Sequence, residues 1–326
     1  MAETKQLLVL SDIHFAGPAE KERVDFELQQ VHNPMSRMFI RFFRRVVWLR
    51  DPFGHNHLLD QLLERAGAPD IVIANGDYSC DSAFIGVMDD PSFQSASLCI
   101  GKLREKFGAR LRLTIGDHEI GKQSLAGRSG GFRIGSLQRA THELGLQPTW
   151  SVKLEFHTLI GVTSSLLALP VFEPETLPNE RDAWKESRNE HIRKVAALFE
   201  DIPPGHRILL FCHDPSALPF LAQIPQVSER FSQIERTVIG HLHTPLVFRL
   251  SRVLAGMPTL TFLGNAVRRM SSALNRARGW KPFKVVLCPS LAGSQLLKDG
   301  GFYRVLLHQN GRAELIFEPL RWENPA

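Results

Sequence analysis

The clearest pattern along the chain is a series of short apolar runs, each followed by a polar or glycine-containing segment. Five of these runs occupy residues 6–10, 70–74, 110–115, 207–212 and 237–239. Continuous apolar runs of this length are typical of strands that are buried on both faces. The pattern also predicts strands over 151–156, 159–163, 258–263 and 283–288.

Helical stretches lie between these runs, over residues 57–66, 92–107, 133–144 and 186–200. Strands that alternate with helices predict a layered α/β fold. Near the C-terminus, Asn310-Gly311 separates two strand-like segments and predicts a hairpin over about 302–318. A chain of 326 residues with 43% apolar residues can form one large α/β domain or two smaller ones.

We favour a single domain over 1–326. It carries an amphipathic insertion at about 31–53, after the first strand, and a basic segment and hairpin at about 264–320. The chain shows neither an internal repeat nor a low-complexity tract that would suggest a repeat architecture.

Polar clusters follow the five apolar runs in a fixed order. They are Asp12-x-His14, Gly76-Asp77, Gly116-Asp117-His118-Glu119, His213 and Gly240-His241-x-His243. In an open α/β sheet the ligand crevice lies outside the carboxyl ends of the strands. We therefore expect all five clusters along one edge of one sheet.

The clusters contain the side chains that two divalent cations require. The candidate ligands are three carboxylates and four imidazoles, namely Asp12, Asp77, Asp117, His14, His213, His241 and His243. His118 is left over for chemistry. Mixed carboxylate and imidazole ligands suit Mn, Fe or Zn better than Ca or Mg. Each motif is common on its own, but the five together predict a paired-metal site, which is typical of phosphoester hydrolysis.

The order of the motifs resembles the signature of the calcineurin-like metallophosphoesterase superfamily, D-x-H, GD, GNH[DE], H and GHxH. The similarity extends over about residues 7–265. It implies a layered α/β/β/α sandwich with the metal site at the C-terminal ends of the strands. By similarity, the first metal is held by Asp12, His14, Asp77 and His243, and the second by Asp77, Asp117, His213 and His241.

The resemblance also implies a mechanism, in which a metal-bridging hydroxide attacks phosphorus. His118 then faces the phosphoryl group as a general acid or a charge stabiliser. The clear departure is Asp117, where the family usually has Asn. A carboxylate there adds a negative charge, which tightens metal binding and makes the metal pair a weaker Lewis acid.

Another pair of histidines, His55 and His57, has a spacing that could bind metal. The sequence favours the alternative, in which they open the helix at 57–66.

Residues 34–50 form a second informative segment. Asn33 and Pro34 predict a helix start, and Asp51-Pro52 predicts its end. The apolar residues fall on one stripe, formed by Met35, Met38, Phe39, Phe42, Phe43, Val46 and Val47. The polar face carries Arg37, Arg41, Arg44 and Arg45 without an acidic residue. This pattern favours contact with an anionic membrane surface, and the alternative is a stripe that packs on the domain.

Charge is also unevenly distributed. The formal net charge is +5, and residues 236–298 contain neither Asp nor Glu. A basic region beside a metal site attracts anionic substrates or surfaces. Nucleic acid is an unlikely partner because aromatic residues interleaved with Lys and Arg are sparse outside the 34–50 helix.

The predicted function is hydrolysis of a phosphoester or pyrophosphate bond on a membrane-associated, lipid-linked substrate. The apolar and basic additions are similar in character to those of the UDP-2,3-diacylglucosamine pyrophosphatases of lipid A synthesis. The alternatives are a soluble phosphoesterase acting on nucleotides, cyclic nucleotides or phosphoproteins, and a non-enzymatic scaffold. Four cysteines without paired spacing and the absence of a visible secretory signal predict a cytoplasmic protein, peripheral on the inner membrane if the helix binds lipid.

Overall fold

The computed structural model describes residues 4–23, 26–29, 31, 33–124, 129–262 and 265–322, and in these residues the strands form two sheets. The first sheet has the order β10-β9-β1-β2-β3. Its strands are β1 (Lys5–Leu10), β2 (Ile71–Ala74), β3 (Leu111–Leu113), β9 (Gly301–Leu307) and β10 (Ala313–Pro319). β1, β2 and β3 are parallel, and the C-terminal hairpin β9–β10 adds to β1 in the antiparallel direction.

The second sheet has the order β4-β5-β6-β7-β8. Its strands are β4 (Thr149–Lys153), β5 (His157–Val162), β6 (Arg207–Cys212), β7 (Ile234–Ile239) and β8 (Val285–Leu287). β5 to β8 are parallel, and β4 pairs with β5 in the antiparallel direction.

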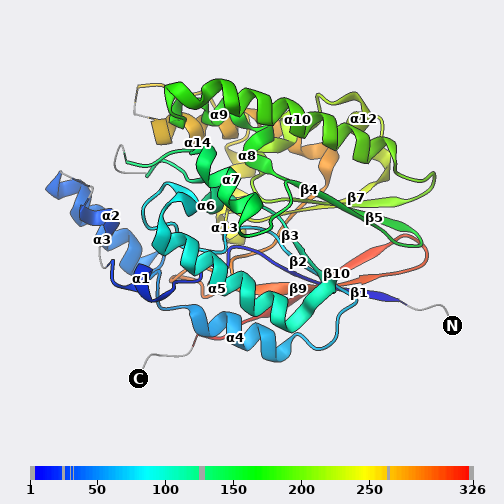
Figure 1. Cartoon of the computed structure of the whole chain (residues 1–326), viewed down its shortest axis with the longest axis horizontal. Helices are drawn as coiled ribbons and strands as arrows, with labels where there is room; N and C mark the ends of the chain where they lie inside the picture. The colour runs from blue at the N-terminus through cyan, green and yellow to red at the C-terminus, as the bar shows by residue number, and fades with distance from the viewer. Residues whose placement is uncertain are drawn as a thin grey trace.

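Helices cover the outer faces of both sheets, so the layers follow the order α/β/β/α (Figure 1). α4 (Asn56–Arg65) and α5 (Asp90–Phe107) lie against the first sheet, and α10 (Arg181–Glu200) and α12 (Pro225–Ser228) lie against the second (Figure 1). The remaining helices are α1 (Pro18–Lys21), α2 (Phe26–Gln29), α3 (Pro34–Val46), α6 (Asp117–Ile120), α7 (Ile134–His142), α8 (Ser164–Leu167), α9 (Leu169–Phe172), α11 (Leu218–Leu221), α13 (Pro245–Val253) and α14 (Asn265–Arg276). In the part of the chain that the structure describes, we find no helix with the length and apolar content needed to cross a bilayer.

The alternation of side chains along β1 explains its continuous apolar run. Leu7 and Val9 point into a core between the sheets, where they meet the inner residues of the second sheet, such as Phe211. Leu8 and Leu10 point the other way, into the core under α4 and α5. Because both faces are buried, every position of the strand is apolar.

The structure confirms the strands predicted from the five apolar runs, but the expectation of a single sheet is wrong. The first three runs form β1, β2 and β3, and the other two form β6 and β7 of the second sheet. An apolar run shows that both faces of a strand are buried, and it contains no information on whether a helix or a second sheet covers them.

The predicted strand at 258–263 is also wrong over residues 258–262. Residues 258–262 form neither a strand nor a bridge, and Phe262 is exposed. Residue 263 lies outside the described residues. The predicted helices correspond to α4, α5, α7 and α10, and the predicted hairpin is β9–β10.

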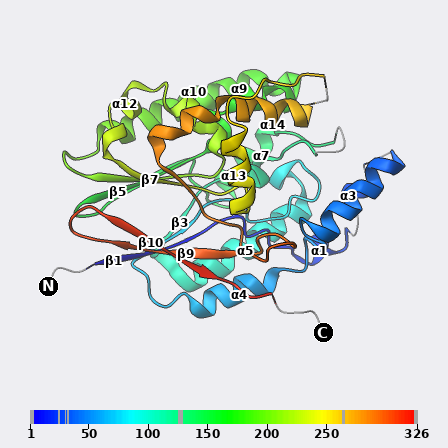
Figure 2. The ribbon, with the colours of Figure 1, turned by 180° about the vertical axis from the view of Figure 1, so that it is seen from behind.

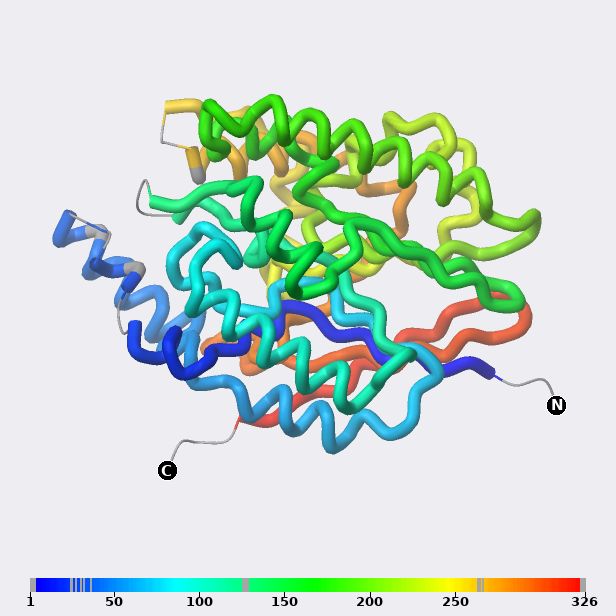
Figure 3. Tube along the Cα trace, in the orientation of Figure 1, coloured from blue at the N-terminus to red at the C-terminus, as the bar shows by residue number. Residues whose placement is uncertain are grey.

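α3 projects from the body of the protein, away from the packed layers (Figures 1 and 2). In the Cα trace, α3 projects at the end of the molecule toward which the C-terminal end of strand β1 points (Figure 3). α3 ends at Val46, earlier than predicted, because the amides of Val47 and Trp48 both donate to the Phe43 carbonyl. Single-domain organisation stays a prediction, and the pairing of β9 with β1 supports it.

Candidate metal centre

The structure brings all eight predicted site residues together at the C-terminal ends of strands. Asp12 and His14 follow β1, and Asp77 follows β2. Asp117 and His118 begin α6 just after β3. His213 directly follows β6, and His241 and His243 follow β7, so the two sheets contribute to one site.

One group of side chains consists of Asp12, His14 and His243, with candidate ligand atoms within 4.8 Å of one another. The His14 Nε2 atom lies 3.2 Å from the His243 Nε2 atom. The His243 Nε2 atom is also 3.3 Å from the Asp12 Oδ1 atom. Three ligand atoms of this type, converging on one point, can hold a transition-metal ion.

A second group consists of Asp117, His213 and His241. The Asp117 Oδ1 atom lies 3.1 Å from the His213 Nε2 atom and 2.9 Å from the His241 Nδ1 atom. This arrangement provides ligands for a second cation beside the first.

Asp77 lies between the two groups. Its candidate ligand atom is within 4.8 Å of those of Asp12 and His213. The Asp77 Oδ1 atom accepts a hydrogen bond of 3.0 Å from the His118 amide. The Asp77 Oδ2 atom is buried, and among the described residues it faces the Nε2 atoms of His213 and His118, at 3.2 and 3.6 Å, without a hydrogen bond. A buried carboxylate oxygen of this kind is costly unless a cation satisfies it, so the site fits metal.

The backbone at these positions is strained. Five of the eight residues have positive φ angles, namely Asp12, His14, Asp77, His241 and His243. The left-handed conformation is uncommon for residues with a side chain and costs on the order of 1–3 kcal/mol each when the surroundings hold it. The sharp turns that result direct these side chains into the site.

Two glycines allow the loops to approach each other closely. Gly76 has a φ of +94°, and a Cβ atom there would lie 2.7 Å from the Gly116 Cα atom. At Gly116, a Cβ atom would overlap the carboxylate and amide of Asp77. Glycine is therefore required on both sides of this contact.

Backbone carbonyls orient two of the imidazoles. The His213 Nδ1 atom is 2.6 Å from the Asn75 carbonyl oxygen, and the His14 Nδ1 atom is 3.3 Å from the Ser79 carbonyl oxygen. Since a carbonyl only accepts, each Nδ1 carries a proton, and the ring in its neutral form presents the lone pair of Nε2 to the site. Metal-binding histidines are commonly oriented in this way.

The electrostatics of the site favour a cation. Burial and Asp117 raise the pKa of the Asp77 carboxyl, but His118 and His213 outweigh them and hold that pKa below its usual value. Burial lowers the pKa of His213, but the Asp77 and Asp12 carboxylates outweigh burial and hold it well above its usual value. The carboxylates therefore attract positive charge to the centre of the site, which a bound cation provides.

Comparison with known proteins identifies the family. Residues 5–245 match the family profile described as calcineurin-like phosphoesterase. The chain belongs to this family. Membership makes it a metal-dependent phosphoesterase that uses divalent metal ions and a phosphoester substrate.

One solved structure supports the fold, and a second one matches at a lower TM-score. A dimetal phosphatase from Danio rerio is 11% identical, with a TM-score of 0.51, and the match covers 96% of this chain and 98% of that one. A phosphopantetheinyl hydrolase from Mycobacterium tuberculosis is 14% identical, with a TM-score of 0.39, over 74% of this chain and 84% of that one. A search of curated proteins finds no match.

Glu119 of this calcineurin-like phosphoesterase holds two of the metal-site loops together. Its carboxylate accepts hydrogen bonds from the amides of Gly116, Asp77 and Tyr78, at 2.8, 3.0 and 2.8 Å. The sequence places Glu119 in a motif but does not show this role, because the bonds join two segments that are distant in the chain.

Two further contacts of the site could not be read from the sequence. The Lys122 Nζ atom lies 3.0 Å from the Asp117 Oδ2 atom. The Trp48 ring packs against the His243 ring in a tilted arrangement, with centroids 4.8 Å apart. A lone Lys and a Trp at the end of a predicted helix carry no pattern that points to a metal site.

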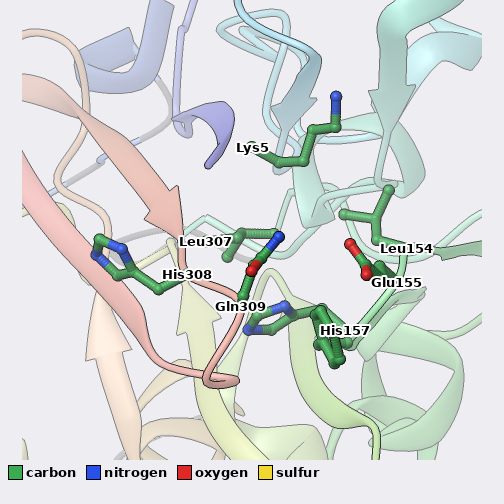
Figure 4. A pocket seen from close by; sticks show the side chains of 8 residues that line it. Lys5, Leu154, Glu155, His157, Leu307, His308 and Gln309 are labelled. Atoms are coloured by element: carbon green, nitrogen blue, oxygen red, sulfur yellow. The ribbon is translucent and has the colours of Figure 1, made fainter. Parts of the chain in front are cut away.

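Other histidines lie apart from the eight. A small pocket at the opposite end of the strands is lined by Lys5, His157 and His308, among others (Figure 4). The His55 and His57 rings lie 6.1 Å apart, and neither residue belongs to a metal-sized cluster among the described residues.

Proposed function

We propose that the centre binds two divalent cations and hydrolyses a phosphoester or pyrophosphate bond. Asp12, His14 and His243 would hold one ion, and Asp117, His213 and His241 the other, with Asp77 bridging them. The observation that carries the proposal is the buried Asp77 carboxylate, whose candidate ligand atom lies within 4.8 Å of those of Asp12 in one group and His213 in the other. The ions, which we expect to be Mn, Fe or Zn, would supply an activated water and neutralise phosphoryl charge.

His118 is our candidate for the group that meets the substrate. Its Nδ1 atom is held by the Ser79 carbonyl at 3.0 Å, and its Nε2 atom lies 3.6 Å from the Asp77 Oδ2 atom. Burial lowers the pKa of His118 to about 3. The ring is therefore neutral in the free protein, and the negative charge of a bound substrate would favour its protonation. It would then act as general acid or charge stabiliser.

We infer that the substrate is lipid-linked and reached from an anionic membrane surface. The apolar stripe of α3 is exposed instead of packed on the domain, and Phe39 and Phe42 are 67% and 63% exposed. A row of aromatic rings connects this stripe to the site. Phe39 stacks on Phe43 and Phe43 on Trp48, with ring centroids 6.4 and 6.3 Å apart, and Trp48 contacts His243. An exposed aromatic stripe opposite an arginine-rich face suits a membrane interface with anionic lipid.

A cavity near the base of α3 supports the same substrate class. It has a volume of about 480 Å³. Apolar rings of Phe26, Phe53 and Phe84 line it together with Lys21 and Arg50. Cys80, three residues beyond Asp77, also lines it, so the cavity is next to the metal centre. Asp51 and Asp81 also line the cavity, and Arg44 is a third cationic side chain there. A lining of apolar rings with more cationic than acidic side chains fits a molecule with an apolar tail and a phosphate.

Competition between substrates tests this proposal. Mn-loaded protein is offered bis-p-nitrophenyl phosphate, p-nitrophenyl phosphate, nucleotides and UDP-2,3-diacylglucosamine in mixed micelles, and chelated protein serves as the control. We expect metal-dependent hydrolysis with a preference for the lipid substrate. A preference for nucleotides would contradict the lipid-linked substrate and favour a soluble phosphoesterase. Bound metal without any hydrolysis would favour a scaffold.

A further inference from the structure

The two oxygen atoms of Asp117 face different partners. The Oδ1 atom faces the imidazoles of His213 and His241, at 3.1 and 2.9 Å. The Oδ2 atom faces the Lys122 ammonium group at 3.0 Å. Asp117 is 1% exposed, and the Lys122 side chain is largely buried. One carboxylate oxygen is therefore available to a metal while a lysine occupies the other.

Lys122 also contacts His118. Its Nζ atom lies 2.5 Å from the His118 Nε2 atom, and the His118 Nδ1 atom faces the Ser79 carbonyl. A carbonyl only accepts and an ammonium group only donates, so the neutral ring carries its proton on Nδ1 and accepts from Lys122 at Nε2. Without substrate, a single ammonium group thus contacts both Asp117 and His118.

The local backbone explains why Lys122 reaches both residues. α6 ends at Ile120, and Gly121 adopts a φ of +99°. The Gly121 amide donates to the Asp117 carbonyl at 2.8 Å, and the Lys122 amide donates to the Phe84 carbonyl at 3.2 Å. The chain therefore turns back, and the Lys122 side chain returns over the first turn of α6. A residue with a Cβ at Gly121 would lie 2.7 Å from the Gly131 carbonyl oxygen.

Lys122 pairs with Asp117, whereas the nearby cation Arg269 pairs with a different carboxylate. The guanidinium group of Arg269 pairs with Glu175 at 2.6 Å. Arg269 is close enough to Lys122 for their positive charges to repel each other. Asp117 adds a third buried carboxylate to a site that already contains Asp12 and Asp77. Buried carboxylates that are grouped in one site repel each other, and a nearby cation offsets this repulsion.

We propose that Lys122 is a positioning residue that cancels the added charge of Asp117. The pair would then present the metal with an oxygen ligand that is close to neutral overall, as the Asn of the resembled GNH[DE] motif would be. This inference rests on the proposed metal centre. It explains how the chain accommodates Asp117 without over-stabilising the bound ion.

Metal affinity in the absence of substrate tests the pair. Binding of Zn²⁺ and of Mn²⁺ alone is titrated for the wild-type protein, Lys122→Met, Asp117→Asn and the double variant. We expect Lys122→Met to tighten binding by roughly tenfold or more, since removing a like charge a few ångströms away shifts an ionic equilibrium by at least one order of magnitude. Asp117→Asn should weaken binding, and the double variant should return to within about threefold of wild type because the two changes have opposite signs.

Thermal unfolding of the metal-free variants provides a second readout. Lys122→Met should lower Tm, because it leaves the Asp117 charge buried and unpaired, and adding Asp117→Asn should restore part of the loss. The matched control is the exposed pair Lys102 and Asp60, at 2.7 Å, whose variants Lys102→Met and Asp60→Asn should leave metal affinity unchanged.

The outcomes separate the two proposals. If the wild-type protein binds neither ion, the metal centre itself is wrong. If it binds metal and Lys122→Met has wild-type affinity for both ions, the metal centre stands and the charge-cancelling role of Lys122 is overturned.

Discussion

Asp77 illustrates how much the centre depends on single residues. It is fully buried, has a φ of 59°, and lies between the two groups of ligands. The His118 amide holds its Oδ1 atom, which leaves Oδ2 as the oxygen that points into the site. In our proposal, a residue with this position serves both metal sites at once.

Replacement of Asp77 should therefore remove metal and activity together. In Asp77→Ala, both ligand groups lose their shared carboxylate, so we expect loss of bound metal and of hydrolysis. Elemental analysis of the dialysed protein and an assay with bis-p-nitrophenyl phosphate measure both. A variant that retains two ions would show that Asp77 does not bridge.

His118 should behave differently from Asp77. In our proposal His118 contacts the substrate and is not a ligand, so His118→Ala should retain its metal. Activity should fall by about 10²–10⁴-fold, the usual contribution of a general acid or base. The same two measurements apply, and a variant with nearly wild-type rate would contradict the assigned role.

At the scale of elements, α3 is the part that departs from the compact layers. Its stripe lies in solvent, and its base is tied to the body where the Leu296 amide donates to the Val47 carbonyl at 3.3 Å. Leu296 and Leu297 are exposed there as well. An element with this much apolar exposure usually marks an interaction surface.

Charged substitutions in the stripe test membrane binding. The double change Phe42→Glu and Phe43→Glu should abolish co-sedimentation with vesicles that contain anionic lipid, because it removes the apolar contact and adds negative charge. Leu98→Glu is the matched control, since Leu98 is an exposed apolar residue on α5. If the double variant binds vesicles as well as the control does, the stripe has another function.

At the scale of the whole molecule, the centre joins the two sheets. β1, β2 and β3 of the first sheet lead to proposed ligands, and so do β6 and β7 of the second. An ion bound by residues of both sheets stabilises only the folded arrangement. Metal binding and global stability should therefore be coupled.

Removal of metal should lower the melting temperature. A ligand present at 100 times its Kd stabilises the folded state by about 2.7 kcal/mol per site. A chain of this size should then lose about 5 °C or more on chelation. Calorimetry with and without chelator measures the shift, and Asp77→Ala should show none. An equal Tm with and without metal in the wild-type protein would contradict the coupling.

The sequence by itself determined the strands that carry the site and the family of the chain. The apolar runs that form β1, β2, β6 and β7 follow from burial on both faces. Each run shows this burial in its own residues, without information from the rest of the chain. The motifs after them follow from chemistry, because carboxylates and imidazoles are side chains that suit a pair of divalent metal ions. Both signals are local, so they could be read without coordinates.

Only the tertiary structure decided how these parts are arranged. The division of the strands between two sheets, the bonds of Glu119 to Gly116 and Asp77, and the pairing of Lys122 with Asp117 all depend on contacts that the local pattern does not encode. The same holds for the stripe of α3, since an amphipathic helix has the same sequence pattern whether its apolar face packs on the protein or lies in solvent. The local periodicity shows which side chains prefer to be buried, and the three-dimensional structure determines which part of the protein, if any, covers those side chains.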